Sequence, residues 1–216
     1  MKTVVEQSGG RISQCRKPTG WLGRLALWNM NSRHSKVTDW GLGHVSVERE
    51  YTILDVGCGG GRTLSKLAAM AMKGKVYGID HSEESVATSK KTNARLINDG
   101  RVEVHHGSVS QLPFTEGTFD LVTAVETHFW WPDLPTDMRE VFRVLTSGGK
   151  LIVIAEVYKG ANTTVAKLAE KYSSRAGMKM LDIDQHRELF AQAGYSDIQV
   201  VTEPKKAWIC GIGRKP

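Results

Sequence analysis

The feature that most constrains this chain is a glycine-rich turn that directly follows a short apolar run. Residues 51–61 read Tyr-Thr-Ile-Leu-Asp-Val-Gly-Cys-Gly-Gly-Gly. The apolar part suits a strand buried on both faces, and Gly57, Gly59 and Gly61 let the backbone turn sharply and approach a ligand with no Cβ in the way. Apolar residues at helical spacing follow over 62–72, so the free amides of a helix N-terminus should face the turn. The pattern predicts a strand–turn–helix unit that holds a nucleoside-bearing ligand.

The spacing of the glycines argues against a dinucleotide site. A dinucleotide fingerprint has its third glycine three places after the second, and Arg62 stands there. Asp55, just before the turn, would repel a pyrophosphate but can bond an ammonium group or a loop amide. A tight turn without a ligand is the alternative that the motif alone leaves open. The first candidate ligand-binding residues are Asp55, Gly57, Cys58, Gly59 and Gly61.

A carboxylate closes the second predicted strand. Residues 75–80 read Lys-Val-Tyr-Gly-Ile-Asp, and Asp80 stands roughly 20 residues beyond the glycines, where an acid can accept both hydroxyls of a ribose. Asp80 or Ser82 could also cap the helix that begins near Ser82, and the two roles are compatible. His81 is a candidate to flank the nucleoside.

The glycine turn and the carboxylate after the second strand resemble the motifs of the class I S-adenosylmethionine-dependent methyltransferases. The first motif of that family is an acidic residue followed by Gly-x-Gly-x-Gly. The resemblance covers about residues 51–157, and Leu112-Pro-Phe114, Phe119-Asp120 and Gly148-Gly149 bring the chain closest to the ubiquinone/menaquinone-biosynthesis-like group of small-molecule enzymes. It implies that the loop cradles the methionine part of S-adenosyl-L-methionine and that the acid closing the second strand binds its ribose.

The third segment of the resemblance, from Val102 to Phe114, is expected to lie beside the adenine. Many relatives carry an acid that bonds the adenine amino group here, whereas this chain has Ser108. A hydroxyl can accept that bond more weakly, and a backbone contact from Val109 is the alternative.

Catalytic groups are expected at the carboxyl end of the fourth strand, over 117–126, because ligands of doubly wound sheets bind outside the strand ends. The methyl donor is already activated by its positive sulfur, so the protein mainly aligns the acceptor and excludes water. Where the acceptor must lose a proton, Glu126 or His128 is the best-placed base, with His34 as a third candidate. Glu126 could instead bond the ammonium of the cofactor or a lid residue.

Aromatic side chains mark two candidate substrate contacts. Phe129, Trp130 and Trp131 directly follow the fourth strand and form either a wall that stacks on a planar ligand or a plug at the edge of the core. Trp28 and Trp40 lie in the first fifty residues. That segment, 1–50, is predicted to be a helical extension, either a lid over the ligands or an amphipathic segment packed on the sheet.

The remaining patterns predict the fold class. Strand and helix patterns alternate from 51 to 216 in one domain, which predicts an α/β, doubly wound, mostly parallel sheet, and the resemblance implies seven strands with the last one antiparallel. The later elements are a helix over 134–145, a turn at Gly148-Gly149, a strand over 150–156, a helix over 183–193 and a hairpin of 195–202 with 206–212 around Glu203-Pro204.

Composition limits the partners. The 29 basic and 23 acidic residues give a net charge of +6, but the positive residues are scattered, and no Asn/Asp-Pro-Pro-aromatic tetrapeptide follows the fourth strand, so nucleic acid is disfavoured. No apolar stretch could serve as a signal or a membrane span, so we expect a cytoplasmic protein. Three widely spaced cysteines match neither a zinc pattern nor a disulfide framework. The oligomeric state is open, with a homodimer as one option.

The sequence therefore predicts a methyltransferase that acts on a small molecule with S-adenosyl-L-methionine as its cofactor. Three alternatives stay open at this point: a cofactor-binding protein without catalysis, an RNA methyltransferase and an NAD-dependent oxidoreductase. Neither the methyl acceptor nor the accepting atom follows from the residues.

Overall fold

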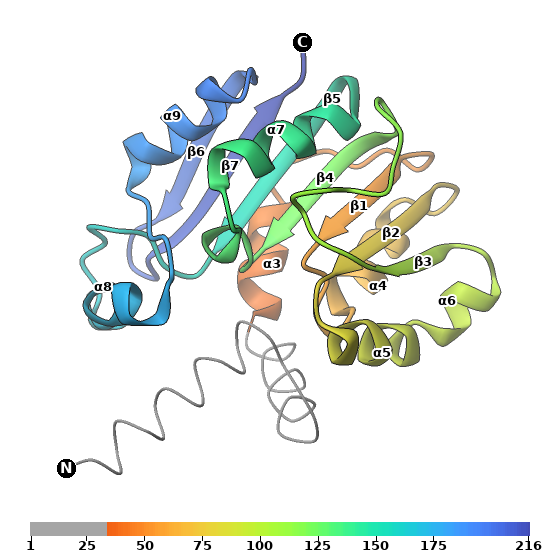
Figure 1. Ribbon diagram of the computed structural model, residues 1–216, viewed down its shortest axis with the longest axis horizontal. Helices are drawn as coiled ribbons and strands as arrows, with labels where there is room; N and C mark the ends of the chain where they lie inside the picture. Colours follow the sequence, from red (N-terminus) through yellow and green to blue (C-terminus); the bar gives the residue numbers. More distant parts are fainter. Residues whose placement is uncertain (1–33) are drawn as a thin grey trace.

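Seven strands form one sheet in the order β3-β2-β1-β4-β5-β7-β6 within residues 34–216, the part of the chain that this computed structural model describes (Figure 1). The strands are β1 (Thr52–Val56), β2 (Lys75–Asp80), β3 (Val102–His106), β4 (Phe119–Val125), β5 (Leu145–Ala155), β6 (Ser196–Glu203) and β7 (Trp208–Arg214). The helices are α3 (Ser35–Leu42), α4 (Arg62–Met70), α5 (Glu83–Thr92), α6 (Ala94–Asn98), α7 (Leu134–Val144), α8 (Thr164–Ala176) and α9 (Ile183–Gln192), with a short 3-10 turn η1 (His128–Trp130).

The order in which strands are added to the sheet reverses at β1. β1 pairs in parallel with β2 on one side and with β4 on the other, so the chain leaves the central strand first toward one edge and later toward the opposite edge. This arrangement opens a crevice at the carboxyl ends of β1 and β4, where ligands bind in open α/β sheets. The predicted doubly wound sheet and the position of the glycine turn are confirmed.

The last strand is antiparallel, as predicted. β7 inserts between β5 and β6 and runs antiparallel to both. The predicted hairpin is also confirmed, because β6 ends at Glu203 and β7 begins at Trp208. Within the described residues, no helix is both long and apolar enough to cross a membrane.

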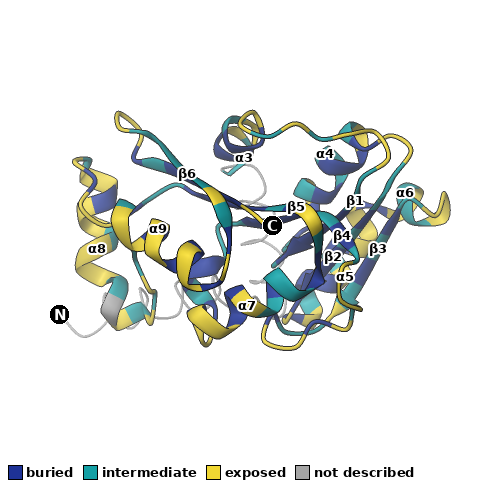
Figure 2. Ribbon diagram, turned by 90° about the horizontal axis from the view of Figure 1, so that it is seen from above, coloured by how far each residue is buried: buried dark blue, intermediate teal, exposed yellow. Residues whose placement is uncertain are grey.

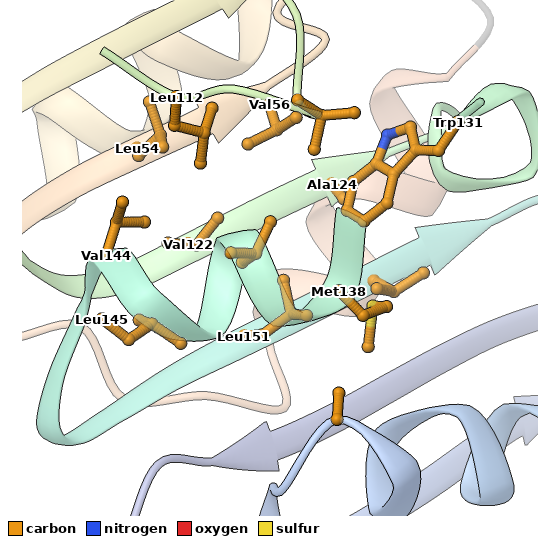
Figure 3. Close-up of a cluster of buried hydrophobic side chains, with 14 of the residues drawn as sticks. Leu54, Val56, Leu112, Val122, Ala124, Trp131, Met138, Val144, Leu145 and Leu151 are labelled. Atoms are coloured by element: carbon orange, nitrogen blue, oxygen red, sulfur yellow. The ribbon is translucent and has the colours of Figure 1, made fainter. Parts of the chain in front are cut away.

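Helices cover both faces of the sheet (Figure 2). On one face α3, α4 and α5 bury Val37, Leu64 and Val86 in one cluster against the sheet. On the other face α7 and α9 bury a second cluster, which includes Met138 and Phe190. Figure 3 shows how the side chains of β1, β4 and α7 meet in this second cluster. Both cores lie against the strands that end at the crevice, so packing fixes the strand ends from two sides.

One predicted boundary was wrong. β5 begins at Leu145, directly after α7, and not at 150 after the glycine turn. The register with β4 shifts between Phe119 and Leu121, so residues 146–149 bulge out of the ladder. A Cβ on Gly149 would come within 3.0 Å of the Phe119 carbonyl oxygen, which explains why glycine stands at this bulge.

The described part of the N-terminal extension packs on the sheet. α3 contacts β5 and β7, and Gly41 lies inside this helix. A Cβ on Gly41 would collide with the Ile154 side chain, so the glycine serves close packing. Residues 1–33, including the predicted helix around Trp28, lie outside the described residues. The movement of this extension as a lid stays a prediction.

Candidate active site

A cavity of about 230 Å³ opens at the carboxyl ends of β1, β2 and β4. Its walls come from the turns after these strands and after β3, together with the first residues of α3 and α4. The lining residues are His34, Ser35, Thr38, Val56, Gly57, Cys58, Gly59, Gly60, Arg62, Thr63, Lys66, Ile79, Asp80, His81, Ser85, Gly107, Ser108, Val109, Val125, Glu126, Thr127, Trp130, Trp131 and Pro132. Most of the predicted site residues therefore meet in one place.

The glycine turn has the conformation that its sequence predicts. Gly57, Gly59 and Gly61 have φ angles of 75°, 51° and 81°, a region that residues with a Cβ rarely adopt. A Cβ on Gly57 would also come within 2.6 Å of the Thr127 side chain. Gly57 and Gly59 line the cavity, whereas Gly61 does not and instead lies close to Asn93 at the end of α5, whose amide donates to the Gly61 carbonyl at 2.9 Å.

Asp80 is held rigidly at the edge of the cavity. Its Oδ2 accepts the Gly59 backbone N–H at 2.9 Å, and its Oδ1 accepts the Ser82 backbone N–H at 2.9 Å. Ser82, and not Asp80, caps α5, because its hydroxyl accepts the N–H of Ser85. An ionised carboxylate has about four acceptor positions, so Asp80 can accept further hydrogen bonds from a ligand.

Asp55 lies beneath the turn and does not line the cavity. The Thr123 hydroxyl donates to its Oδ1 at 2.6 Å. Burial, with a smaller contribution from the Asp80 carboxylate, raises the pKa of Asp55 from 3.8 to about 7, against the lowering effect of the Thr123 hydrogen bond. Asp55 thus sits where it can support the turn from within the core.

Four other predicted contacts line the cavity, three of them from neighbouring turns. Ser108 and Val109 line it after β3, and the Gly107 N–H donates to the Asp80 carbonyl at 3.0 Å, which brings the two turns together. His81 lines it as well, with Nδ1 at 3.7 Å from Asp80 Oδ1. Cys58 lines it with a buried thiol whose pKa is raised well above the ordinary value, first by burial. This thiol is therefore protonated at neutral pH, in keeping with a space-filling role.

Glu126 is the most unusual residue of the site. It directly follows β4 with a φ of 59°, a left-handed conformation that is uncommon for a residue with a Cβ. Its backbone N–H donates to the Ile154 carbonyl at 2.9 Å, and its Oε1 accepts the backbone N–H of Glu156. Such strain is maintained only where the surroundings impose it, and it concentrates at functional sites.

A wall of the cavity is fixed by Thr127, which follows β4 directly after Glu126 and lines the cavity. Its hydroxyl donates to the Val56 carbonyl at 3.1 Å and accepts the Trp131 indole N–H at 3.0 Å. This pair of bonds ties the turn after β4 to the end of β1. Trp130, Trp131 and Pro132 therefore form an apolar side of the cavity beside the glycine turn.

His34, which directly precedes α3, lines the cavity. His34 Nε2 lies 3.8 Å from Glu156 Oε2, which joins the start of α3 to the end of β5. Lys66 of α4 fastens the same end of α3, because its ammonium group donates to the Ser35 carbonyl at 3.1 Å, to the Ser35 hydroxyl at 2.9 Å and to the Asp39 carboxylate. Neither Lys66 nor Asp39 belongs to a recognisable motif, so this contact could not be predicted from the sequence.

Besides Gly61 and Asp55, three further predicted site residues do not line the cavity. The η1 turn directs His128 into the protein, where its Nε2 lies 3.2 Å from Nε2 of His186. Phe129 is buried in a cluster with Tyr158, away from the cavity lining. Trp40 lies on the side of α3 that packs against Trp208, with ring centroids 5.8 Å apart. Trp28, the fourth predicted aromatic contact, lies outside the described residues.

The buried histidine pair has a defined hydrogen-bond pattern. The Asp182 carbonyl can only accept, so Nδ1 of His186, at 2.7 Å, donates to it, and Nε2 of His186 accepts from His128. His128 Nδ1 then keeps a buried lone pair, and among the described residues it finds no partner. Burial lowers the pKa of both imidazoles, so both are neutral at neutral pH. No group of three or more His, Cys, Asp or Glu side chains that could hold a metal occurs within 34–216.

Comparisons with known proteins agree with this arrangement. The model of a family described as "Methyltransferase domain" matches residues 54–153. A demethylmenaquinone methyltransferase of Oceanobacillus iheyensis is 36% identical over 113 residues, which cover 51% of this chain and 46% of that protein. The corresponding enzyme of Geobacillus kaustophilus is 28% identical over 190 residues, which cover 78% of this chain and 80% of that protein.

Among solved structures, the chain is similar to the complex between the Haloferax volcanii Trm112 methyltransferase activator and a methyltransferase. The TM-score is 0.78 at 19% identity, over 91% of this chain and 96% of that one. At this identity the similarity concerns the fold, and it confirms the sheet order with an antiparallel β7. The match of residues 54–153 to a methyltransferase domain confirms the predicted enzyme class, an S-adenosylmethionine-dependent methyltransferase, and the predicted cofactor, S-adenosyl-L-methionine.

Proposed function

We propose that this protein transfers a methyl group from S-adenosyl-L-methionine to a small, planar and largely apolar acceptor. The observation that carries the proposal is the cavity itself, which combines a rigid carboxylate at Asp80 with an apolar wall at Trp130 and a second carboxylate at Glu126, whose backbone is in the left-handed conformation. Relatives named demethylmenaquinone methyltransferase support an acceptor with a ring system of this kind. Because the matched segment spans less than half of the first of these relatives, the acceptor is inferred here from the site.

The chemistry of the donor set fits the cofactor. Asp80 faces the cavity with acceptor positions left over after its two backbone bonds, which suits the two hydroxyls of a ribose. The turn at Gly57 and Gly59 offers backbone close to the same space with no side chain on it. Ser108 and Val109 stand on the other side of Asp80, where the adenine would lie. The alternative of an NAD-dependent oxidoreductase lacks support, because no third glycine stands at Arg62 for a pyrophosphate.

When bound, the cofactor supplies a methyl group that its sulfonium already activates. The residues of the chain then have to hold the acceptor in line with that methyl group and keep water out. Trp130 and Pro132 offer a flat apolar surface for the acceptor, and Thr127 holds that surface in place through Trp131. Aromatic faces also attract a nearby positive charge.

Two groups could take a proton from the acceptor. Glu126 and His34 both line the cavity, whereas His128 is buried against His186 and is not part of this proposal. Glu126 has one oxygen engaged by the Glu156 N–H, which fixes its carboxylate. We assign the general base to Glu126 or His34 and leave binding of the cofactor ammonium as the alternative role of Glu126.

Kinetics of Glu126→Gln and His34→Asn distinguish these roles. Loss of a general base lowers kcat by roughly 100-fold or more at an unchanged dissociation constant for S-adenosylhomocysteine. Loss of an ammonium contact weakens that binding instead, by about tenfold or more. If neither variant changes kcat by more than a few-fold, the acceptor needs no base from these two residues.

The function is tested by transfer of a labelled methyl group from S-adenosyl-L-methionine. The assay offers reduced naphthoquinones as planar acceptors, and total RNA and bulk protein as alternative acceptors. The expected result is label in the naphthoquinone fraction, lost in Asp80→Ala. Label in RNA or protein alone would replace the small-molecule acceptor, and cofactor binding without any transfer would indicate a cofactor-binding protein.

A further inference from the structure

Exposed apolar side chains of the described residues gather on one helix. Four large apolar side chains are strongly exposed in this part of the protein, and three of them belong to α8: Val165 at 62%, Leu168 at 56% and Tyr172 at 41%. The fourth is Met72. The spacing of three and four residues puts the α8 side chains in one row along one side of the helix, which we call the α8 stripe. Single exposed apolar residues are ordinary, whereas a row of them marks a contact surface.

The stripe is exposed because α8 packs on the protein with other residues. Ala166 is 1% exposed and joins a buried cluster with Phe129, Tyr158 and Ile209. A small residue is enough to bring the helix close to this cluster, so the longer side chains of the stripe project away from it. Figure 2 shows α8 as mostly exposed at one end of the molecule.

A basic row runs beside the stripe. Lys167, Lys171 and Arg175 follow one another at intervals of four on the same helix, and all three are exposed. Glu170 is the only acidic residue of α8. Residues 171 and 175 lie three and seven positions after Leu168, so positive charge borders the apolar row, and the Lys171 ammonium lies 5.7 Å from the centre of the Tyr172 ring.

The helix is connected to the wall of the cavity. Directly beyond α8, the Lys179 N–H donates to the Phe129 carbonyl at 2.9 Å. The Lys179 ammonium donates to the carbonyls of Trp131 and Pro132 at 3.0 and 2.6 Å. Trp131 and Pro132 line the cavity, so the segment that carries the stripe is fastened to the proposed acceptor wall. α8 also follows β5, whose carboxyl end lies on the same side of the sheet as the cavity (Figure 1).

We propose that α8 docks the protein on an anionic lipid surface, with the stripe in the interface and the basic row among the headgroups. An amphipathic helix that lies in a membrane surface combines apolar insertion with attraction of Lys and Arg to anionic lipids. Three side chains are far fewer than the roughly 20 residues per side of a standard protein interface, so a lipid surface suits the stripe better than a protein partner. This docking would place the cavity wall beside the lipid, whatever the methyl acceptor is.

The test is co-sedimentation of the full chain with vesicles of phosphatidylcholine, with and without phosphatidylglycerol. The combined variant Val165→Ser, Leu168→Ser and Tyr172→Ser removes the stripe, and Met72→Ser, in the turn after α4, is its matched control. The combined variant Lys167→Gln and Lys171→Gln removes two charges, and Lys90→Gln with Lys91→Gln removes two from the exposed end of α5. Thermal unfolding by circular dichroism checks that each variant folds.

The proposal expects binding to the phosphatidylglycerol vesicles that weakens as salt is raised. Each α8 variant should bind these vesicles about tenfold or more weakly, whereas both controls bind like the natural chain. The proposal is overturned if the natural chain does not co-sediment with these vesicles or if the controls lose as much binding as the α8 variants. It is also overturned if the stripe variant splits an oligomer in sedimentation equilibrium while vesicle binding is absent. Vesicle binding needs no methyl transfer, so its failure is distinguishable from failure of the proposed function.

Discussion

The backbone N–H of Gly59 donates to Oδ2 of Asp80 at 2.9 Å, which joins the turn after β1 to the end of β2. The Ser82 N–H holds the other carboxylate oxygen, so the orientation of Asp80 is fixed before any ligand arrives. A pre-organised acceptor avoids the cost of ordering a side chain on binding. The ribose-binding role that we propose for Asp80 depends on this geometry.

Asp80→Asn should weaken the binding of S-adenosylhomocysteine by roughly 10- to 100-fold, because a neutral amide replaces a charged acceptor of hydroxyl hydrogen bonds. Isothermal titration calorimetry measures this dissociation constant. Asp99→Asn, at an exposed carboxylate after α6, is the matched control and should bind like the natural chain. Equal affinity in Asp80→Asn and Asp99→Asn would remove Asp80 from the ribose site.

Gly57→Ala should destabilise the protein more than Gly100→Ala does. Both glycines have a left-handed φ, of 75° and 71°, but a Cβ on Gly57 would collide with Thr127, whereas a Cβ on Gly100 meets nothing within 4 Å. The conformational cost alone is about 1–2 kcal/mol, and the collision should add about 1–3 kcal/mol at Gly57. Urea denaturation gives both free energies of unfolding, and equal losses would mean that the turn yields without strain.

The His128–His186 pair should make the fold less stable in mild acid. The pKa of each imidazole is lowered in the folded protein, first by burial, from 6.5 in the unfolded chain. Below about pH 6.5 the unfolded chain therefore binds protons at these two histidines, whereas the folded chain does not. Each histidine then lowers the free energy of unfolding by up to about 1.4 kcal/mol per pH unit as the pH falls.

His128→Gln keeps a donor toward His186 and cannot titrate, so its stability should fall less steeply from pH 6.5 to 5 than that of the natural chain. His44→Gln, at an exposed histidine, should leave the slope unchanged. Thermal melts across this range provide the comparison. A slope in His128→Gln as steep as the natural one would show that the pair does not control the acid response.

Asp55 should act in the opposite direction. Its pKa is raised from 3.8 to about 7 in the folded protein, so between these values the folded chain holds a proton that the unfolded chain has lost. This contribution to stability is complete below pH 3.8 and is lost as the pH rises through about 7, by up to about 1.4 kcal/mol per pH unit.

Asp55→Asn carries an amide donor where the protonated acid has its hydroxyl, so it should gain stability relative to the natural chain as the pH rises from 5 to 8. Asp184→Asn, at an exposed carboxylate of α9, should show no such trend. Denaturant midpoints at both pH values decide the question. A constant difference between Asp55→Asn and the natural chain would mean that Asp55 is ionised throughout.

The strand ends and the glycine turn could be predicted from the sequence, and the direction of nearby side chains could not. Asp80 and Glu126 were predicted because each directly follows an apolar run, and the carboxyl ends of parallel strands share one edge. His128 follows Glu126 by only two residues, but the η1 turn directs it toward α9. That direction depends on His186, which is 58 residues away and carries no local signal.

Long-range contacts also explain the other differences between the site residues predicted from the sequence and those that the structure brings together. Trp40 is expected at the site as part of a lid over the ligands, yet its ring packs against Trp208 on β7 and does not line the cavity. The sequence does not predict the contact of Lys66, because the importance of this residue comes from Ser35, a partner that only the folded chain brings near. The left-handed Gly57 shows the converse case, in which a residue type alone predicts the local conformation.

A crystal structure of the protein with S-adenosylhomocysteine tests the central claim most directly. The account predicts ribose hydroxyls within about 3 Å of the Asp80 carboxylate, the amino acid part on the turn at Gly57 and Gly59, and the sulfur facing the space beside Trp130. A ligand whose ribose lies away from Asp80, or a crystal soaked at saturating ligand with the cavity empty, would contradict it.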